Sequence, residues 1–205
     1  MKSINTEKII LASGSPRRKE LLEQVGINIE ISPSTIDEET VSIKKPENYV
    51  KELSFLKAAD ISLSYPDSWI LGADTIVVIG NQILGKPQSK PDAIDMLTKL
   101  NNREHSVYTG FCLIHQKKNA IIKKCVETKV YFKYLSDQEI QWYVNTGEPF
   151  DKAGAYGIQG IGAVLVKQIK GSYSNVVGLP VCEVVETLMH LNIIQFKDLN
   201  HHVTH

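Results

Sequence analysis

The sequence predicts an α/β fold built on a mixed sheet, in a single domain spanning residues 1–205. Three observations predict it: short aliphatic runs of strand type, helical spacings with capping signals between them, and two pairs of strand-like runs joined by tight turns. Tight turns join antiparallel strands, so a purely parallel, doubly wound sheet is not expected. We therefore expect an α+β arrangement or a mixed-sheet α/β fold.

In the N-terminal half, the start of the first helix has the clearest local signals. Ser15 before Pro16 is typical of a helix N-terminus, and Gly26 is typical of its end. Gly80 and Asn81 form a frequent hairpin turn. The expected elements, in order, are a strand over 8–13, a helix over 16–26, a strand over 28–32, a polar loop over 33–45, a helix over 46–63 and a hairpin of 69–79 with 82–84.

In the C-terminal half, Ser136 followed three residues later by Glu139 predicts a capping box. No internal repeat or linker stands out. The expected elements are a helix over 90–100, two long strands over 106–115 and 121–134 around a turn, a helix over 136–145, a glycine-rich stretch over 146–162, a strand over 163–169 and a last helix over 180–191.

Composition limits the partners that this chain can have. Hydrophobic residues make up 42% of the chain, and 23 basic residues balance 23 acidic ones, so no overall field attracts nucleic acid. No apolar run reaches the roughly 20 residues of a bilayer span, and residues 1–8 do not begin a secretory signal. The three cysteines form no C-x-x-C pair, which argues against a thiolate zinc site. We expect a cytoplasmic protein without a nucleic acid or membrane partner.

Residues 13–18, Ser-Gly-Ser-Pro-Arg-Arg, form the first candidate site. Backbone N–H groups at a helix N-terminus, with two hydroxyls and two guanidiniums, suit a polyanion. Gly14 permits close approach of a ligand to the backbone. The segment lacks the Gly-x-x-x-x-Gly-Lys spacing of a P-loop. For this segment alone, a solvated helix face carrying Arg17, Arg18 and Lys19 is an equally good interpretation.

Asp74 is an acid in the middle of a strand that is otherwise almost wholly apolar. Burying a carboxylate there is costly without a partner cation or metal, which favours an active-site acid over a structural ion pair. Asp37, Glu38 and Glu39 form a second acidic cluster, and Mg²⁺ or Mn²⁺ accepts such oxygen ligands. An acidic loop that is only solvated is the alternative for this cluster.

Three lysines and one loop complete the candidates. Lys57 falls inside a predicted helix, while Lys86 and Lys152 lie next to glycine-containing segments, and each alone resembles a surface residue. The glycine-rich residues 147–160 can approach a flat base, and Gln159 offers both a donor and an acceptor to a pyrimidine edge. A flexible surface loop is the alternative.

Six segments in order carry a family resemblance: LASGSPRRKELL at 11–22, GADT at 72–75, GKP at 85–87, VYTG at 107–110, DKAGAYGIQG at 151–160 and GLP at 178–180. Together they resemble the Maf family of nucleotide pyrophosphatases over about residues 10–191, although no single segment would suffice. The resemblance implies an elongated, two-lobed fold like that of the inosine triphosphate pyrophosphatases, with a central cleft for the nucleotide, and a homodimer.

The resemblance also implies an activity and a set of site residues. The activity is hydrolysis of dTTP and UTP, or of modified pyrimidine nucleotides, to the monophosphate and pyrophosphate. Asp74 matches the catalytic acid/base. Arg17, Thr75 and Gln159 match the positions that distinguish the dTTP and UTP branch from the branch acting on 7-methyl-GTP. The remaining polar active-site positions match Ser13, Arg18, Glu38, Lys57 and Lys86.

These residues predict a mechanism in which water attacks the α-phosphorus. A divalent cation, Mg²⁺ or Mn²⁺, held by Asp74 or Glu38 would bridge triphosphate oxygens while a carboxylate orients the water. Side chains around the phosphates would bind them and neutralise their charge. This phosphate-binding set is Ser13, Arg17, Arg18, Lys57 and Lys86.

Two alternative functions stay open. A non-catalytic nucleotide-sensing regulator of cell division would use the same basic cleft, but Asp74 and Glu38 would then repel a triphosphate unless a metal intervened. A pyrophosphatase for modified or purine nucleotides would differ only in base selection. The sequence departs from the family pattern at Asn101-Asn102 and at Phe55-Leu56. Neither departure removes a catalytic group.

Overall fold

The framework of the computed structural model, which describes residues 3–38, 41 and 45–196, is a seven-stranded mixed sheet. The strand order is β3-β2-β4-β6-β7-β8, with β5 paired to β4. The strands span Ile9–Leu11 (β2), Glu30–Ile31 (β3), Trp69–Ile79 (β4), Gln82–Leu84 (β5), Glu104–His115 (β6), Ala120–Phe132 (β7) and Val166–Lys170 (β8). Strand β2 is parallel to β3 and β4, and the remaining pairs are antiparallel. The mixed sheet confirms the predicted fold class.

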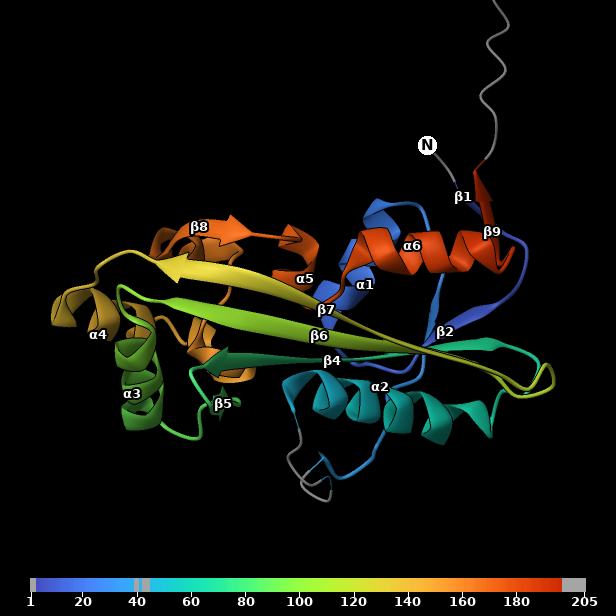
Figure 1. Ribbon diagram of the computed structural model, residues 1–205, viewed down its shortest axis with the longest axis horizontal. Helices are drawn as coiled ribbons and strands as arrows, with labels where there is room; N and C mark the ends of the chain where they lie inside the picture. The colour runs from blue at the N-terminus through green and yellow to red at the C-terminus, as the bar shows by residue number, and fades with distance from the viewer. Residues whose placement is uncertain (1–2, 39–40, 42–44, 197–205) are drawn as a thin grey trace, which may run out of the picture.

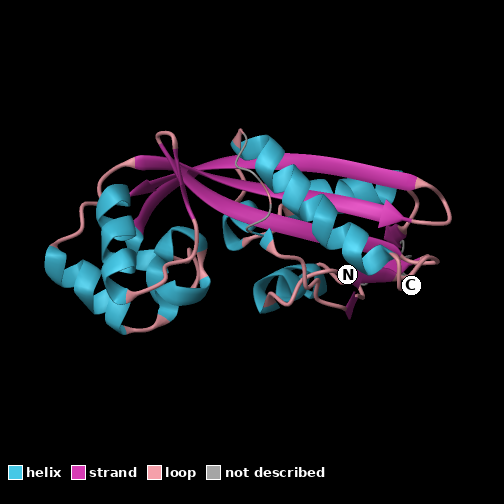
Figure 2. Cartoon of the chain, turned by 90° about the horizontal axis from the view of Figure 1, so that it is seen from below, coloured by secondary structure: helices cyan, strands magenta, loops and turns pink. Residues whose placement is uncertain are grey.

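Helices cover both faces of this sheet and one end of it. The helices are α1 (Pro16–Gln24), α2 (Pro46–Ser62), α3 (Lys90–Leu100), α4 (Asp137–Asn145), α5 (Tyr173–Val177) and α6 (Val181–His190). The molecule is elongated, with α1, α5 and α6 on one face of the sheet, α2 on the other, and α3 and α4 at one end (Figure 1). Figure 2 shows the long helix crossing the strands and the group of helices at the end. The helices along the two faces of the sheet belong to one lobe, and α3 and α4 at its end belong to the other (Figure 1).

The hydrophobic core is divided between the same two lobes. One buried cluster joins α1 and α6 to β2, β4 and β6, and a smaller one lies under α2. A third cluster joins α3 and α4 to the far ends of the strands and to three short 3₁₀ segments. These segments are η2 (Glu148–Asp151), η3 (Ala153–Ala155) and η4 (Gly160–Leu165). A site between the lobes is therefore supported by separate cores on either side.

Two glycines bring α2 unusually close to the sheet. A Cβ atom on Gly72 would lie 2.2 Å from the carbonyl oxygen of Ser54, and one on Gly110 would lie 2.3 Å from that of Val50. Only glycine fits at such positions, because a backbone cannot yield as a side-chain tip does. The helical spacing then places Lys57 on the same side of α2 as Val50 and Ser54, facing the sheet.

Most local predictions are confirmed. The helix over 90–100, the hairpin of β4 and β5, and the capping box at Ser136 all form as expected. Ser15 has the extended backbone of an N-cap, but its side chain makes no capping hydrogen bond. No helix in the described part of the chain is both long enough and apolar enough to cross a bilayer.

Two predictions were wrong, and two features of the fold were not predicted. Residues 163–165, expected to begin a strand, close the 3₁₀ segment η4, and the strand starts at Val166. The glycine-rich stretch contains three 3₁₀ segments rather than an open loop. The short helix α5 was not predicted. Neither was the antiparallel pair of β1 (Ser3–Asn5) and β9 (Ile194–Phe196), which joins the two ends of the described chain.

Candidate active site

One edge of β4 is open in the middle of the sheet. Strand β6 pairs with β4 along one side from Ile70 to Val78. On the other side, β2 pairs with β4 only as far as Leu71, and pairing with β5 begins at Val77. Residues 72–76 therefore have no described strand beside them on that side. We call this gap the notch; the turn after β2 and the segment after β5 both adjoin it.

Asp74 and Thr75 point to opposite faces of the sheet, because neighbouring side chains alternate along a strand. Asp74 faces α2 and is only 6% exposed. Its Oδ1 atom accepts a hydrogen bond of 2.7 Å from Nζ of Lys57. The same ammonium group lies 2.8 Å from Oε1 of Glu38. Lys57 thus holds two carboxylates together on the α2 face of the notch.

Thr75 lies on the face that α1 covers, beside Arg18. The Arg18 guanidinium donates three hydrogen bonds: Nε to the carbonyl oxygen of Gly178 at 2.8 Å, Nη1 to Oγ of Ser13 at 3.0 Å and Nη2 to Oγ1 of Thr75 at 3.2 Å. All three acceptors are neutral, so none of these hydrogen bonds of Arg18 is made to a carboxylate. Gly178 has a φ of 131°, which favours glycine at this corner.

The charges at the notch affect one another across the strand. Burial lowers the pKa of the Arg18 guanidinium, and the Asp74 carboxylate opposes this effect. Burial alone would raise the pKa of Glu38, but the hydrogen bond and charge of Lys57, with the charges of Lys86 and Arg18, lower it overall. Arginine keeps its proton in proteins, so at neutral pH the notch carries both an arginine cation and an ionised Glu38.

The loop after α4 closes the notch from the other lobe. Asp151 accepts a hydrogen bond of 2.7 Å from Nη1 of Arg17 and another of 2.6 Å from Nζ of Lys152. Burial raises the pKa of Asp151, but these two cations outweigh burial and lower the pKa to about 2. The N–H of Gly154 donates to the carbonyl oxygen of Gly85 at 2.9 Å. This bond ties the same loop to the segment that carries Lys86.

Glu148 organises the part of this loop that carries Gln159. Its carboxylate accepts hydrogen bonds of 3.0 Å from the backbone N–H groups of Ile161 and Gly162 and from the Tyr143 hydroxyl. The N–H of Gly157 donates to the same hydroxyl oxygen at 3.2 Å. Gln159 itself is half-buried, and its side chain forms no hydrogen bond with another described residue. The loop is fixed on both sides of an amide that remains available to a ligand.

The structure brings most of the predicted residues together at the notch, in two groups. Ser13, Arg18 and Thr75 meet on one face of β4, and Glu38, Lys57 and Asp74 meet on the other. Lys86 is exposed at the rim and forms no salt bridge with another described residue. Arg17 contacts the loop that carries Gln159 through its ion pair with Asp151. Of the predicted acidic cluster, Glu39 lies outside the described residues.

Sequence reasoning missed three residues of the site: Thr109, Asp151 and the carbonyl of Gly178. Thr109 pairs with Thr75 across β4 and β6, and their hydroxyl oxygens are 2.9 Å apart. Thr109 in turn donates to the carbonyl oxygen of Asn175. All three lie in segments that carry the family resemblance, but their partners are remote in the sequence and no local pattern indicates them.

The donor set fits a cation that is shared with a phosphate group. Within the described residues, no three or more His, Cys, Asp or Glu side chains gather as a metal cage. Asp74 and Glu38 nevertheless converge on one point, the ammonium of Lys57. Mg²⁺ is usually bound through one or two carboxylates, with substrate phosphates and water completing its coordination. Two converging carboxylates suit this mode of binding.

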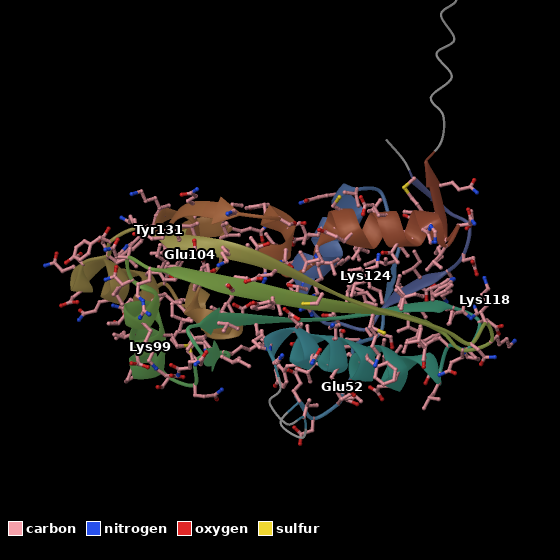
Figure 3. The ribbon with its side chains drawn as sticks, viewed as in Figure 1. Glu52, Lys99, Glu104, Lys118, Lys124 and Tyr131 are labelled. Carbon is pink, nitrogen blue, oxygen red and sulfur yellow. The ribbon has the colours of Figure 1, made fainter. Side chains whose placement is uncertain are left out.

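A shallow cavity of about 180 Å³ lies elsewhere, between α2 and strands β6 and β7, and contains none of the candidate residues. Figure 3 labels Lys124 of this cavity on β7, and Glu52 on α2. Its wall carries both acidic and basic side chains, so it presents no uniform field to a polyanion. Its lining residues are Glu47, Lys51, Tyr108, Lys123, Lys124, Cys125 and Glu127.

Comparisons with known proteins agree with this geometry. Residues 8–191 match the family described as Maf-like protein. The dTTP/UTP pyrophosphatase of Syntrophus aciditrophicus is 48% identical over 96% of both chains, and that of Halalkalibacterium halodurans is 51% identical over 88% of this chain and 94% of its own. The Ham1 protein of Staphylococcus aureus shares the fold, with a TM-score of 0.50 and 13% identity over 91% of this chain and all of its own. The chain belongs to the Maf family.

Proposed function

We propose that this protein is a nucleoside triphosphate pyrophosphatase that hydrolyses dTTP and UTP to the monophosphate and pyrophosphate. The curated relatives reported above are named for this activity and match nearly the whole chain. One structural observation carries the proposal: a buried carboxylate, Asp74, lies one residue from Thr75, which accepts a hydrogen bond from Arg18, an arginine that donates only to neutral acceptors. The notch thus combines an acid for activating water with a cation for phosphate.

Cations on both faces of β4 can bind the polyphosphate. Arg18 donates hydrogen bonds only to neutral acceptors, and Lys86 is exposed at the rim. Both therefore have positive charge to offer β- and γ-phosphate oxygens. The hydroxyl of Ser13 and the turn that follows it add hydrogen-bonding groups beside Arg18. Such preorganised charge commonly contributes most to catalysis of phosphoryl transfer.

Asp74 and Glu38 are the residues that would hold a divalent cation, Mg²⁺ or Mn²⁺. When bound, the cation would polarise a phosphoryl oxygen and lower the pKa of bound water. Lys57 now occupies the position between the two carboxylates. Its long side chain keeps the two acids close together in the free protein, where two bare carboxylates would repel each other.

The proposed reaction is an in-line displacement at the α-phosphorus. The Oδ2 atom of Asp74 forms no hydrogen bond with a described residue, so it can accept a proton from the attacking water. The water oxygen forms a bond to the α-phosphorus while the bond from that phosphorus to the bridging oxygen breaks. The proton passes to Asp74, and pyrophosphate leaves with the bonding electrons. Arg18 and Lys86 stabilise the charge that develops on the leaving group.

A substrate panel tests this function. Purified protein with Mg²⁺ or Mn²⁺ is incubated with dTTP, UTP, CTP, dATP, GTP and 7-methyl-GTP, and monophosphate and pyrophosphate are measured. We expect preferential release of pyrophosphate from dTTP and UTP. Preference for a purine or modified nucleotide would instead indicate the second alternative considered from the sequence. Binding without turnover under every metal would refute the proposal and favour a nucleotide sensor.

The catalytic role of Asp74 needs a matched control. Asp74→Asn should leave the circular dichroism spectrum unchanged and lower kcat by at least about 100-fold, the usual range for a general base. Asp67 is an exposed acid paired with Lys117 at the surface, so Asp67→Asn removes the same charge away from the notch. The control should retain full activity. An undiminished rate in Asp74→Asn would refute the assignment.

We also propose that the protein works as a cytoplasmic homodimer of one domain, residues 1–205. Its composition supports the compartment, and the family resemblance supports the dimer. Light scattering after gel filtration tests the oligomeric state: the chain mass is 22.9 kDa, and the proposal requires about twice that value. A mass equal to that of one chain would refute it.

A further inference from the structure

Arg17 and Arg18 are adjacent in the sequence but have partners of different charge. Arg18 donates to two hydroxyls and a carbonyl, whereas Arg17 forms an ion pair of 2.7 Å with Asp151. No other hydrogen bond of the Arg17 side chain to a described residue is present. Both arginines would be expected to bind phosphate from the sequence alone. In the structure, Arg18 donates to neutral acceptors, whereas Arg17 is held by a carboxylate that it shares with Lys152.

The ion pair also determines which side of the notch the Arg17 side chain is attached to. Asp151 belongs to the loop that carries Gln159, and it is held by Lys152 of the same loop at 2.6 Å. Lys152 is anchored in turn by a hydrogen bond to the carbonyl oxygen of Glu148. Arg17 is thereby attached to the side of the notch that offers an amide to the base. Arg18 is attached to Thr75 and Gly178 on the sheet.

We propose that Asp151 is a specificity-determining residue that acts through Arg17, an inference that rests on the proposed function. Through its ion pair, Asp151 orients the Arg17 guanidinium so that the remaining N–H groups donate to a carbonyl oxygen of the base. Phosphate binding is left to Arg18. Three properties support this division: guanidinium donates and never accepts, the ion pair attaches Arg17 to the loop of Gln159, and that loop is already fixed by Glu148.

The carbonyl at position 4 distinguishes uracil and thymine from cytosine, which carries an amino group there. A donor-only group favours the carbonyl and opposes the amino group. Asp151 therefore contributes to a preference for UTP and dTTP over CTP. Without Asp151, the Arg17 guanidinium would lose the ion pair that fixes its orientation.

Binding measurements test this inference without requiring turnover. Dissociation constants of UMP, CMP and pyrophosphate are measured by calorimetry for the wild type and for Asp151→Asn. We expect the preference for UMP over CMP to fall about tenfold, as for the loss of one well-oriented charged hydrogen bond. The dissociation constant of pyrophosphate should stay within about threefold. Arg18→Ala should show the reverse pattern, with pyrophosphate binding weakened at least tenfold and the base preference unchanged.

Two further variants isolate the path through Arg17. In an Arg17→Ala background, Asp151→Asn should have no further effect on base preference, because the residue through which it acts is gone. Glu23→Gln breaks an exposed ion pair with Lys19 on the same helix as Arg17 and should change nothing. Since Asp151 is exposed, its replacement by asparagine should leave the circular dichroism spectrum unchanged.

Three results would overturn the inference: an unchanged base preference in Asp151→Asn, pyrophosphate binding that becomes at least tenfold tighter, or additive effects of the two substitutions. Tighter pyrophosphate binding would mean that Asp151 only screens a phosphate-binding arginine. The proposed function fails separately, if the wild type hydrolyses neither UTP nor dTTP, because the binding comparison does not depend on turnover.

Discussion

Replacing Lys57 by methionine tests how the notch is held together. Lys57 is 12% exposed and contacts both Asp74 and Glu38. Methionine preserves most of the side-chain volume and removes the charge. The half-exposed Glu38 can then return to water, but Asp74, at 6% exposed, cannot. Removing one partner of a buried ion pair typically costs 3–5 kcal/mol, and access to the open notch places this site at the lower end, about 3 kcal/mol.

Thermal and urea unfolding at pH 7 measure this effect. In a domain of this size, about 3 kcal/mol corresponds to a fall in Tm of roughly 6–12 °C. Asp74→Asn in the same background should recover at least half of the loss, because a neutral amide needs no counter-ion. Lys117→Met, which breaks an exposed pair with Asp67, should cost less than about 1 kcal/mol. A Lys57→Met protein as stable as the wild type, or one that Asp74→Asn does not rescue, would refute the reasoning.

Three further predictions concern packing, pH and metal. Gly110→Ala would place a Cβ atom 2.3 Å from the carbonyl oxygen of Val50 and should lower the free energy of unfolding in urea by about 2–3 kcal/mol. Gly85 has open space around it, so Gly85→Ala should be nearly neutral. Equal effects of the two substitutions would contradict this prediction. Burial lowers the pKa of His105 to about 4. As the pH falls from 6.5 to 4, the histidine therefore takes up a proton in the unfolded chain before it does so in the folded protein, and the free energy of unfolding should fall by roughly 3 kcal/mol. His105→Phe should make this pH dependence weaker, and an unchanged stability profile would contradict the prediction. Chelation with EDTA should abolish turnover but leave Tm within about 2 °C, because Lys57 already holds both carboxylates; a large fall in Tm would indicate a structural metal.

Elements with local signals were predictable from the sequence. The helix Lys90–Leu100 has an amphipathic spacing after Ser89, whose side chain accepts from Asp92, and the capping box at Ser136 needs only residues three apart. The pairing of β1 with β9 joins residues nearly two hundred positions apart in short strands that carry no periodicity. Such a contact depends on the completed fold, so a local pattern does not indicate it.

Part of the candidate site was likewise predictable from local sequence signals, and part was not. The cost of burying Asp74 was enough to predict a cation beside it, and Lys57 is that cation. The alternation of Asp74 and Thr75 also follows from strand geometry. What the sequence did not indicate is the ion pair of Arg17 with Asp151, because each residue has several charged neighbours and only the packing of α1 against the loop selects the pair.

The position of water attack is the most direct test of the central claim. UTP is hydrolysed by the protein in water enriched in oxygen-18, and both products are examined by mass spectrometry. Attack at the α-phosphorus, as the proposed reaction requires, places the heavy oxygen in UMP and leaves pyrophosphate unlabelled. Label in pyrophosphate, or release of inorganic phosphate in place of pyrophosphate, would contradict the account.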